Sequence, residues 1–302
     1  MDNDHPDHHR CGYVAIAGVP NVGKSTLLNA LMGMKLSIIT PRPQSTRRNV
    51  LGILTEESYQ AILMDTPGLL DPAYRLQSAM RAQAVNAIRG CDVLLLMLDA
   101  TRRKERDLDL QIDPAIEAAE ESVPVVLALN KVDRVPKEEL LPVLEQCDAR
   151  GRFSAIVPIS ALRHDGLEAL LGEVADRLPE GPPQYPSDVI TEHPERFFVA
   201  ELVREVVFHR FRKEIPYATA TRVEEFRRGG KKTFISVTIF VERQSQKPIL
   251  LGKGGRSLRQ VGEIARKSIE EFLGEEVYLE LWVKVREQWR HREGHLRDLD
   301  LL

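Results

Sequence analysis

The chain has 302 residues, of which 43% are hydrophobic and 29% are charged. This length is typical of about two domains, and this composition excludes wholesale disorder and fibrous repeats. The formal net charge of −3, taken for the whole chain, argues against a nucleic-acid partner, because neutralising phosphates requires a basic surface. The charge is unevenly distributed, with a net of +3 over residues 186–302 and −6 over residues 1–185.

The three cysteines argue against a disulfide framework or a zinc site. Cys11, Cys91 and Cys147 are odd in number and form no CxxC pair, as is typical of a reducing compartment. Residues 1–10 lack the basic start and apolar run of a signal peptide. The longest apolar stretch, Val93–Leu98, is far shorter than the ~20 residues of a membrane span. We therefore expect a cytoplasmic protein.

The first half of the chain alternates short apolar runs with longer amphipathic ones. Short buried strands that alternate with helices predict an α/β fold with a mostly parallel sheet covered on both faces. The predicted strands are Tyr13–Ala17, Gln60–Met64, Val93–Leu98, Val123–Leu129 and Ala155–Ile159. The predicted helices are Thr26–Met32, Ala79–Ile88, Pro114–Glu120, Lys137–Cys147 and Gly166–Leu178.

A proline-rich stretch separates the two halves. The four prolines of Pro179–Pro186 can continue neither a helix nor a central strand. We therefore predict a disordered tail over residues 1–11, a first domain over 12–180, a linker over 181–194 and a second domain over 195–302. The second domain is predicted to be a small α+β domain of order α-β-β-α-β, with a short helical turn near Pro248–Leu251. Its predicted elements are Phe197–Lys213, Ala218–Phe226, Phe234–Val241, Ser257–Phe272 and Val277–Val285.

One segment carries the motif of a phosphate-binding loop. The sequence GVPNVGKS, residues 18–25, matches GxxxxGK[ST] and lies between a predicted strand and a predicted helix, the context that the motif requires. Glycines let backbone N–H groups close around phosphate oxygens, and the helix N-terminus adds partial positive charge. Lys24 is expected to reach the β- and γ-phosphates, and the Ser25 hydroxyl to bind Mg²⁺. The expected nucleotide-binding residues here are Gly18, Val19, Pro20, Asn21, Val22, Gly23, Lys24, Ser25 and Thr26.

Three further segments follow predicted strands, and open α/β sheets bind ligands at the carboxyl ends of their strands. In DTPG, residues 65–68, Asp65 can hold Mg²⁺ through water and the Gly68 N–H can reach a γ-phosphate, although a plain Pro-Gly turn also explains the motif. In NKVD, residues 130–133, the Asp133 carboxylate can accept both donors of guanine and repels adenine. SAL, residues 160–162, can close the base pocket. These motifs add Asp65, Thr66, Pro67, Gly68, Asn130, Lys131, Val132, Asp133, Ser160, Ala161 and Leu162 to the candidate site.

Together the four motifs resemble the translation-factor-like class of GTPases. The PNVGKST form, the segment Ser45-Thr46-Arg47 and the small second domain resemble the bacterial Era family, over roughly Gly12 to Arg290. The resemblance implies a P-loop GTPase domain that uses GTP/GDP and Mg²⁺. It also implies that Thr46 is the switch threonine, which binds Mg²⁺ together with Ser25 and Asp65.

Catalysis is expected to be slow. Leu69 stands where many GTPases carry a water-orienting Gln, and a leucine cannot orient water. No residue qualifies as a general base, so positioning in the transition state falls to Lys24, Thr46 and Gly68. Relatives with such a replacement use K⁺ near the phosphates, and Asn21 occupies the corresponding position. We therefore hypothesise K⁺-stimulated hydrolysis; the alternative is that Asn21 only forms the turn.

The second domain carries a GxxG loop at residues 252–255, between a short apolar run and a helix. The loop resembles that of a type II KH domain, which clamps single-stranded nucleic acid, although a glycine turn at a helix start is the alternative. From Arg227 to Arg259, nine basic residues stand against one acid, Glu242, which is an electrostatic footprint for a phosphate backbone. Trp282 and Trp289 could stack on bases, but core packing explains them equally well. The expected RNA-binding residues are Gly252, Lys253, Gly254, Gly255, Arg256 and Arg259.

The combined expectation is a GTP-hydrolysing RNA-binding switch. By resemblance, the RNA is the single-stranded 3′ end region of 16S ribosomal RNA, and the role is maturation of the small (30S) ribosomal subunit. The alternative is an RNA-binding chaperone in which GTP only tunes affinity. We expect a monomer. The basic helix Phe197–Lys213 could also give weak peripheral contact with the cell membrane, although packing on its own sheet explains it better.

Overall fold

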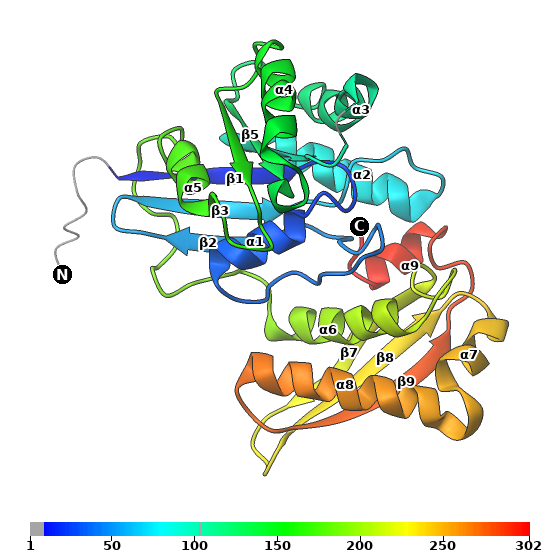
Figure 1. Ribbon diagram of the computed structural model, residues 1–302. Coiled ribbons are helices and arrows are strands. Elements are labelled where there is room, and N and C mark those ends of the chain that lie inside the picture. Colours follow the sequence, from blue (N-terminus) through cyan, green and yellow to red (C-terminus); the bar gives the residue numbers. More distant parts are fainter. Residues whose placement is uncertain (1–8, 103) are drawn as a thin grey trace, which may run out of the picture. The chain divides into compact units, whose positions relative to one another are not determined.

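The computed structural model describes residues 9–102 and 104–302 (Figure 1). Most of the predicted tail over residues 1–11 therefore lies outside the described residues, and the first strand already begins at Arg10. Contacts group the chain into two compact units. Unit 1 comprises residues up to 37, 46–71 and 80–192, and unit 2 comprises residues 38–45, 72–79 and 193–302.

Unit 1 contains a six-stranded sheet in the order β2-β3-β1-β4-β5-β6. All neighbours are parallel except β2, which pairs with β3 in antiparallel fashion, so the predicted P-loop fold with a mostly parallel sheet is confirmed. Strands β4 and β5 are buried along their whole length, as the uninterrupted apolar runs indicated. The strands are β1 (Arg10–Ala17), β2 (Val50–Thr55), β3 (Tyr59–Asp65), β4 (Val93–Asp99), β5 (Val125–Asn130) and β6 (Ala155–Ile159). The sequence reading lacked β2.

The helices of unit 1 alternate with the strands as predicted, but one of them begins earlier in the chain than expected. The helix predicted at Pro114–Glu120 is wrong in its bounds, since α3 covers Glu105–Ile116 and Pro114 lies inside its last turn. A proline near the end of a helix costs only one hydrogen bond, and the chain then turns toward β5. The helices are α1 (Lys24–Met32), α2 (Arg75–Arg89), α3 (Glu105–Ile116), the short η1 (Val132–Arg134), α4 (Lys137–Asp148) and α5 (Leu167–Ala175). Residues 75–79 of α2 group with unit 2 by their contacts.

Residues 181–192, expected as part of a linker, pack on unit 1. The Gln60 side chain is fully buried and accepts the N–H groups of Gln184 and Tyr185 at 2.8 and 2.9 Å. Its amide also donates to the Tyr185 carbonyl oxygen at 2.8 Å. By contact, unit 1 thus continues to Glu192, twelve residues beyond the expected end of the first domain at 180.

Unit 2 has the predicted order α-β-β-α-β. Its sheet runs β7-β8-β9, with β7 antiparallel and β9 parallel to β8, and α6 and α8 lie side by side over it (Figure 1). The elements are α6 (Glu195–Arg210), β7 (Thr219–Arg227), β8 (Thr233–Val241), η2 (Gln244–Gln246), α7 (Lys247–Leu251), η3 (Lys253–Gly255), α8 (Arg256–Leu273), β9 (Val277–Val285) and α9 (Glu293–Asp298). Helix α9 carries no apolar period long enough to be predicted.

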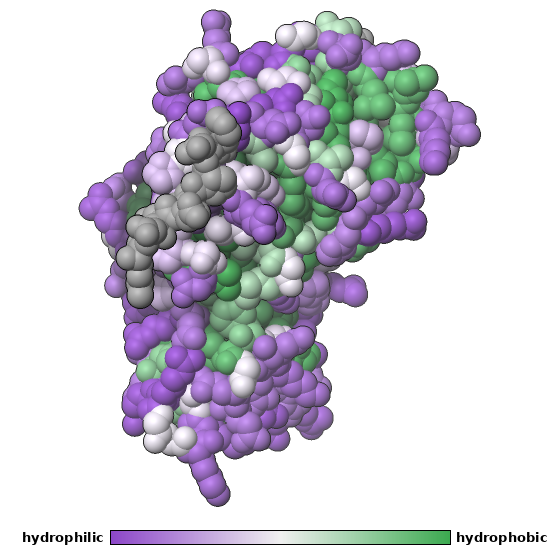
Figure 2. Space-filling model, turned by 90° about the vertical axis from the view of Figure 1, so that its left-hand side faces the viewer, coloured by the Kyte–Doolittle hydropathy of each residue, from purple (hydrophilic) through white to green (hydrophobic). Residues whose placement is uncertain are grey.

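The apolar side of α6 is buried inside unit 2. Val199, Leu202 and Val203 belong to one core cluster with residues of the three strands and of α8. The alternative, that this helix packs on the sheet of its own unit, is thus confirmed. No helix among the described residues is long and apolar enough to cross a bilayer. On the face drawn in Figure 2, hydrophilic residues lie around smaller hydrophobic areas.

Candidate functional site

The predicted phosphate-binding loop connects β1 to α1. Gly23 ends it with φ +115°, and a Cβ there would lie 2.3 Å from Asn130 Nδ2, so only glycine fits. Lys24, the first residue of α1, is buried and donates from Nζ to the carbonyl oxygens of Gly18 and Val19 at 3.0 and 3.2 Å. Burial lowers the pKa of Lys24 to about 8, although nearby Asp65 favours the charged form. The ammonium is thus held within the loop itself.

Three predicted Mg²⁺ ligands meet at the start of α1. Ser25 Oγ donates to Asp65 Oδ2 at 2.7 Å and lies 2.9 Å from Thr46 Oγ1, which is 3.4 Å from the same carboxylate oxygen. Burial raises the pKa of Asp65, against the lowering effects of Lys24 and of the hydroxyl groups. Asp65 Oδ1 has no hydrogen-bond partner within the part of the chain that the structure describes. Mg²⁺ prefers oxygen ligands, and this site offers the Ser25 and Thr46 hydroxyls and the buried, unpartnered Asp65 Oδ1. The residues therefore fit Mg²⁺.

The DTPG turn lies directly against the phosphate-binding loop. A Cβ on Gly68 would come within 2.8 Å of the Pro20 nitrogen, so glycine is needed for the close approach. Thr66 and Pro67 are buried, and the Thr66 hydroxyl donates to the Ile16 carbonyl oxygen at 2.9 Å, which makes both residues supports of the turn. The Leu69 side chain is 5% exposed and packs in the core of unit 1. Leu69 therefore offers nothing polar to orient a water molecule.

Asn130 ties the loops of the base site together. Its side chain is 3% exposed, donates from Nδ2 to the Val22 carbonyl oxygen at 2.8 Å and accepts from the Ala161 N–H at 3.0 Å. Asp133 Oδ1 accepts a hydrogen bond from Ser160 Oγ at 2.7 Å, which orients the carboxylate that was predicted to read guanine. The three predicted loops thus converge. Leu162 is 66% exposed and lies at the surface of this region.

Asp99, which sequence reasoning missed, positions a predicted residue. Lys131 Nζ donates to Asp99 Oδ2 at 2.6 Å and to the Asn21 carbonyl oxygen at 2.8 Å. Burial alone raises the pKa of Asp99, but the hydrogen bonds from Lys131 and Thr101 outweigh it and lower this pKa below its usual value. Asp99 lies at the end of β4, and the other site motifs likewise follow the ends of strands. This position is the signal by which sequence reasoning could have found it. Asn21 has φ +65°, a turn conformation that asparagine tolerates.

The remaining predicted residues of the nucleotide site lie in the same loops. Val19 and Pro20 precede Asn21 in the loop after β1, Thr26 lies in the first turn of α1, and Val132 begins η1.

The GxxG loop stands between α7 and α8. Gly252, Gly254 and Gly255 have φ of +68°, +61° and +76°, and a Cβ on Gly252 would lie 2.6 Å from Ser257 Cβ. A groove of about 320 Å³ adjoins the loop, with apolar side chains from α8 and β9 and basic side chains from α8. It is lined by Gly255, Leu258, Arg259, Gly262, Glu263, Arg266, Leu279 and Leu281. Lys253 and Arg256 do not line the groove, but they are close in sequence to Gly255 and Leu258, which do.

Part of the predicted basic footprint is neutralised. Arg228 pairs with Glu195 and Glu275 at 2.9 and 2.8 Å, and the neighbouring hairpin residues Arg227 and Lys232 also have acidic partners. Those acids lie outside residues 227–259 and were therefore missed by the charge sum. Lys253, Arg256 and Arg259 have no ion pair within 4.0 Å among the residues that the structure covers. Three basic residues without an ion pair therefore lie in and directly after the GxxG loop.

The two tryptophans differ in their exposure to solvent. Trp289 is fully buried and donates from Nε1 to the Ala218 carbonyl oxygen at 2.9 Å, so the stacking alternative is wrong for this residue. Trp282 on β9 is 54% exposed, which leaves stacking open for it.

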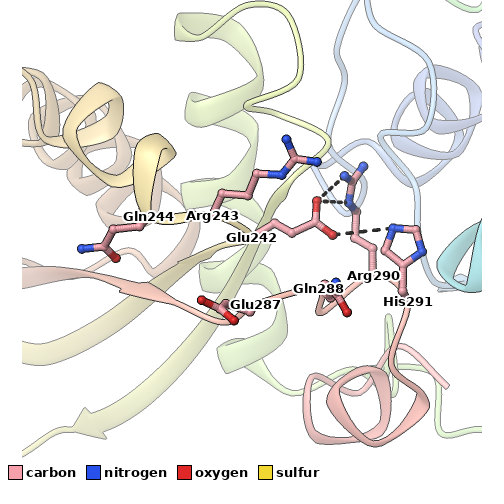
Figure 3. A pocket seen from close by; sticks show the side chains of 7 residues that line it. All are labelled: Glu242, Arg243, Gln244, Glu287, Gln288, Arg290 and His291. Carbon is pink, nitrogen blue, oxygen red and sulfur yellow. Dashed lines mark hydrogen bonds and ion pairs between the residues drawn. The ribbon is translucent and has the colours of Figure 1, made fainter.

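A second cavity in unit 2, of about 500 Å³, has a charged lining (Figure 3). Glu242 is 5% exposed; its Oε2 accepts from Arg290 Nε at 3.1 Å, and its Oε1 lies 3.7 Å from His291 Nε2. The Arg290 guanidinium lies 4.9 Å from the centre of the Tyr74 ring, and its carbonyl accepts the Leu76 N–H at 3.0 Å. These contacts hold segment 72–79, which follows the DTPG turn in the chain. No motif pointed to this cluster.

Comparisons with known proteins agree with this arrangement. Residues 13–131 match the family described as 50S ribosome-binding GTPase, and residues 214–290 match the KH domain family. GTPase Era of Nitratidesulfovibrio vulgaris (strain DP4) is 43% identical over 97% of both chains. GTPase Era of Desulfovibrio desulfuricans is 42% identical over 98% of both.

Two solved structures match over almost the whole chain. Aquifex aeolicus Era bound to GDP and AlF4⁻ matches with a TM-score of 0.91 at 39% identity, over 97% of this chain and 99% of that one. Era in complex with MgGDPNP and nucleotides 1506–1542 of 16S ribosomal RNA matches with a TM-score of 0.92 at the same identity and coverage. The GTPase part and the KH part therefore occur in the same order in the relatives, and the chain belongs to the Era family of GTPases.

Proposed function

We propose that this Era-family GTPase is a switch that binds the single-stranded 3′ end region of 16S ribosomal RNA and assists maturation of the 30S subunit. The groove beside the GxxG loop carries this proposal, because it offers apolar side chains to bases and arginines to phosphates. The matching family description names the 50S subunit. We favour the small subunit because the RNA-bound Era structure, 39% identical to this chain, contains 16S ribosomal RNA.

In unit 1 each loop has a proposed part in GTP hydrolysis. Lys24 brings its charge to the β- and γ-phosphates, and the Gly68 N–H reaches the γ-phosphate. Ser25, Thr46 and Asp65 hold Mg²⁺, which neutralises charge on the phosphate oxygens when it is bound. Burial of Lys24 and Asp65 supports the assignment, because positioned charges act more strongly in a site that excludes water.

The guanine base is read by Asp133. Ser160 occupies one lone pair of Oδ1, so the carboxylate is fixed while its other acceptor sites face the donors of the base. Adenine would place an acceptor against this carboxylate, which costs binding energy. Val22, Asn130 and Ala161 support the pocket through the two Asn130 hydrogen bonds.

Intrinsic hydrolysis is proposed to be slow, with no general base. The buried Leu69 side chain supports this, because water must be oriented by something else. We propose that K⁺ supplies part of the missing positioning through Asn21, whose loop position is the supporting observation. The protein is further proposed to act as a cytoplasmic monomer on the 30S subunit.

Charge reversal tests the RNA site. Lys253→Asp in the GxxG loop is compared with Lys267→Asp, an equal charge change at an exposed position of α8 outside that loop. The probe is a fluorescent single-stranded RNA with the 3′ terminal sequence of 16S ribosomal RNA, and Kd is measured by anisotropy at fixed salt. We expect Lys253→Asp to weaken binding about tenfold or more and the control by less than about threefold. Equal effects would reject the GxxG loop as part of the RNA site.

The chaperone alternative differs in its use of hydrolysis. If GTP only tunes affinity, RNA dissociates equally fast from protein loaded with GTP or with a non-hydrolysable analogue. If the protein is a hydrolysis-driven switch, the two dissociation rates differ, and the difference follows the rate of phosphate release.

A further inference from the structure

Asn29 of α1 binds the segment that follows its own helix. Its Oδ1 accepts the N–H groups of Leu36 and Ser37 at 2.9 and 2.8 Å, and its Nδ2 donates to the Ser37 carbonyl oxygen at 2.7 Å. These bonds use both lone pairs of the amide oxygen and one of the two amide hydrogens. The helix ends at Met32, so one side chain spans the turn after it and fixes the backbone on both sides of the Ser37 Cα.

Ser37 is held in the interior of unit 1, close to Asp65 of the same unit. Ser37 is 2% exposed, and its hydroxyl is one of three that lower the pKa of Asp65, the others being those of Ser25 and Thr46. Ser37 Oγ nevertheless has no partner in hydrogen-bond geometry among the residues that the structure covers, and neither has Asp65 Oδ1. A buried donor and a buried acceptor thus lie near each other without a well-directed hydrogen bond between them.

The two carboxylate oxygens of Asp65 differ in their contacts. Oδ2 accepts from Ser25 Oγ at 2.7 Å and lies 3.4 Å from Thr46 Oγ1, and both hydroxyls are proposed Mg²⁺ ligands. A buried carboxylate needs donors to stay ionised, because desolvation disfavours the charged form. A serine can turn its hydroxyl by rotation about χ1 while its backbone stays bound to Asn29. Ser37 is therefore suited to supply a donor to the second oxygen of Asp65.

We propose that Ser37 is a positioning residue for Asp65, to which it donates a hydrogen bond at Oδ1 when Mg²⁺ is bound, and that Asn29 holds Ser37 in place for this contact. The proposal rests on the proposed function of Asp65 at Mg²⁺. With Oδ1 bound to the Ser37 hydroxyl, the carboxylate stays ionised and its Oδ2 is oriented for the metal site. Asn29 thereby links α1, which begins at Lys24, to the metal site.

The first test measures metal affinity instead of hydrolysis. Mn²⁺, which takes oxygen ligands as Mg²⁺ does and gives an EPR signal when free, is titrated into the full-length protein loaded with GDP. We expect the Kd for Mn²⁺ to rise about tenfold or more in Ser37→Ala and in Asn29→Ala, because both variants lose a hydrogen bond to the charged Asp65. Asn86→Ala, the same substitution at an exposed position of α2, is the matched control and should change this Kd by less than about twofold.

The double variant tests whether Asn29 acts through Ser37. In the Ser37→Ala background, Asn29→Ala should change the Kd for Mn²⁺ by less than about twofold, because the two residues act in series. The Kd for GDP, measured in EDTA, should be unchanged in all these variants. A merely structural role of Ser37 or Asn29 would weaken GDP binding with and without metal alike.

A second pair of variants isolates the hydroxyl from the fit of the side chain. Ser37→Thr and Ser37→Val introduce side chains of the same shape, of which only threonine carries a hydroxyl. Any strain at this buried position is common to both, so we expect the threonine variant to bind Mn²⁺ at least about fivefold more tightly than the valine variant. If Ser37→Ala does not fold, this pair carries the comparison.

The outcomes separate the inference from the function on which it rests. Wild-type affinity for Mn²⁺ in Asp65→Asn would overturn the role of Asp65 at the metal and the inference with it. Weak binding in Asp65→Asn together with wild-type binding in Ser37→Ala, or equal binding in Ser37→Thr and Ser37→Val, would overturn only the inference. Fully additive effects in the double variant would overturn the part assigned to Asn29. Weakened metal binding with unchanged metal-free binding of GDP would support the inference.

Discussion

Replacing Asn130 with aspartate tests how the nucleotide site is held together. Asn130 is 3% exposed; it donates to the Val22 carbonyl oxygen at 2.8 Å and accepts from the Ala161 N–H at 3.0 Å. The variant Asn130→Asp keeps the shape and the acceptor for Ala161. It replaces the donor by an oxygen that faces the Val22 carbonyl, so an attractive contact becomes a repulsive one.

The expected loss follows from these contacts. A buried carbonyl that loses its partner costs about 1–3 kcal/mol, which corresponds to about 5- to 150-fold in affinity. Burial raises the pKa of the new carboxyl, and the protonated form regains an O–H donor for Val22. We therefore expect the Kd for GDP to rise about 10- to 100-fold at pH 8 and to recover in part at pH 6.

The assay is titration with fluorescent GDP at both pH values, expressed relative to the wild-type protein. Asn130→Ala is the matched control, because it also loses the donor but cannot regain one on acidification. An unchanged Kd at pH 8, or the same response to pH in both variants, would refute this role of Asn130.

Three further predictions concern the same site. Asp133→Asn should shift the preference from guanine to xanthine nucleotides, as competition binding will show; a retained preference for GTP rejects the base-reading role. Hydrolysis should be faster in KCl than in NaCl at matched ionic strength, and Asn21→Ala should abolish the difference; equal rates in the wild-type protein count against the K⁺ hypothesis. Because burial lowers the pKa of Lys24 to about 8 and phosphate favours its charged form, nucleotide binding should take up a proton at pH 8.5 and almost none at pH 6.5. Calorimetry in two buffers of different ionisation enthalpy measures this uptake, and its absence at pH 8.5 contradicts the buried state of the amine.

The nucleotide loops could be predicted because each motif follows an apolar run. A parallel sheet brings the carboxyl ends of its strands to one edge, so Gly23, Asn130 and Ala161 had to converge there once the strands were recognised. Asp99 follows β4 in the same way but lies in no motif. Its part became visible only with Lys131 bound to it.

Other features depend on contacts that periodicity does not contain. Strand β2 is an edge strand paired on one side only, and its short run with Gly52 gives a weak pattern. Leu279 and Leu281 alternate like core residues, yet they line the groove because α8 does not cover them completely. Arg228 counted as free positive charge, while its acidic partners come from distant positions in the chain.

The contacts of segment 38–45 show the same limit from another side. The residues before Thr46 carry no motif that assigns them to unit 2, and the buried Arg204 reads in the sequence as an ordinary charged residue of a helix. Only the packed structure reveals that its partners are Glu201 and the Ser45 carbonyl.

The central claim, that the groove beside the GxxG loop holds the 3′ end of 16S ribosomal RNA, is tested most directly in cells. RNA crosslinked to the protein is sequenced for the wild-type chain and for Lys253→Asp at equal expression. We predict crosslinks concentrated in the 3′ end region of 16S ribosomal RNA for the wild type and a strong reduction of this signal in the variant. Crosslinks spread over other RNA, or a 3′ end signal that the variant leaves intact, would contradict the claim.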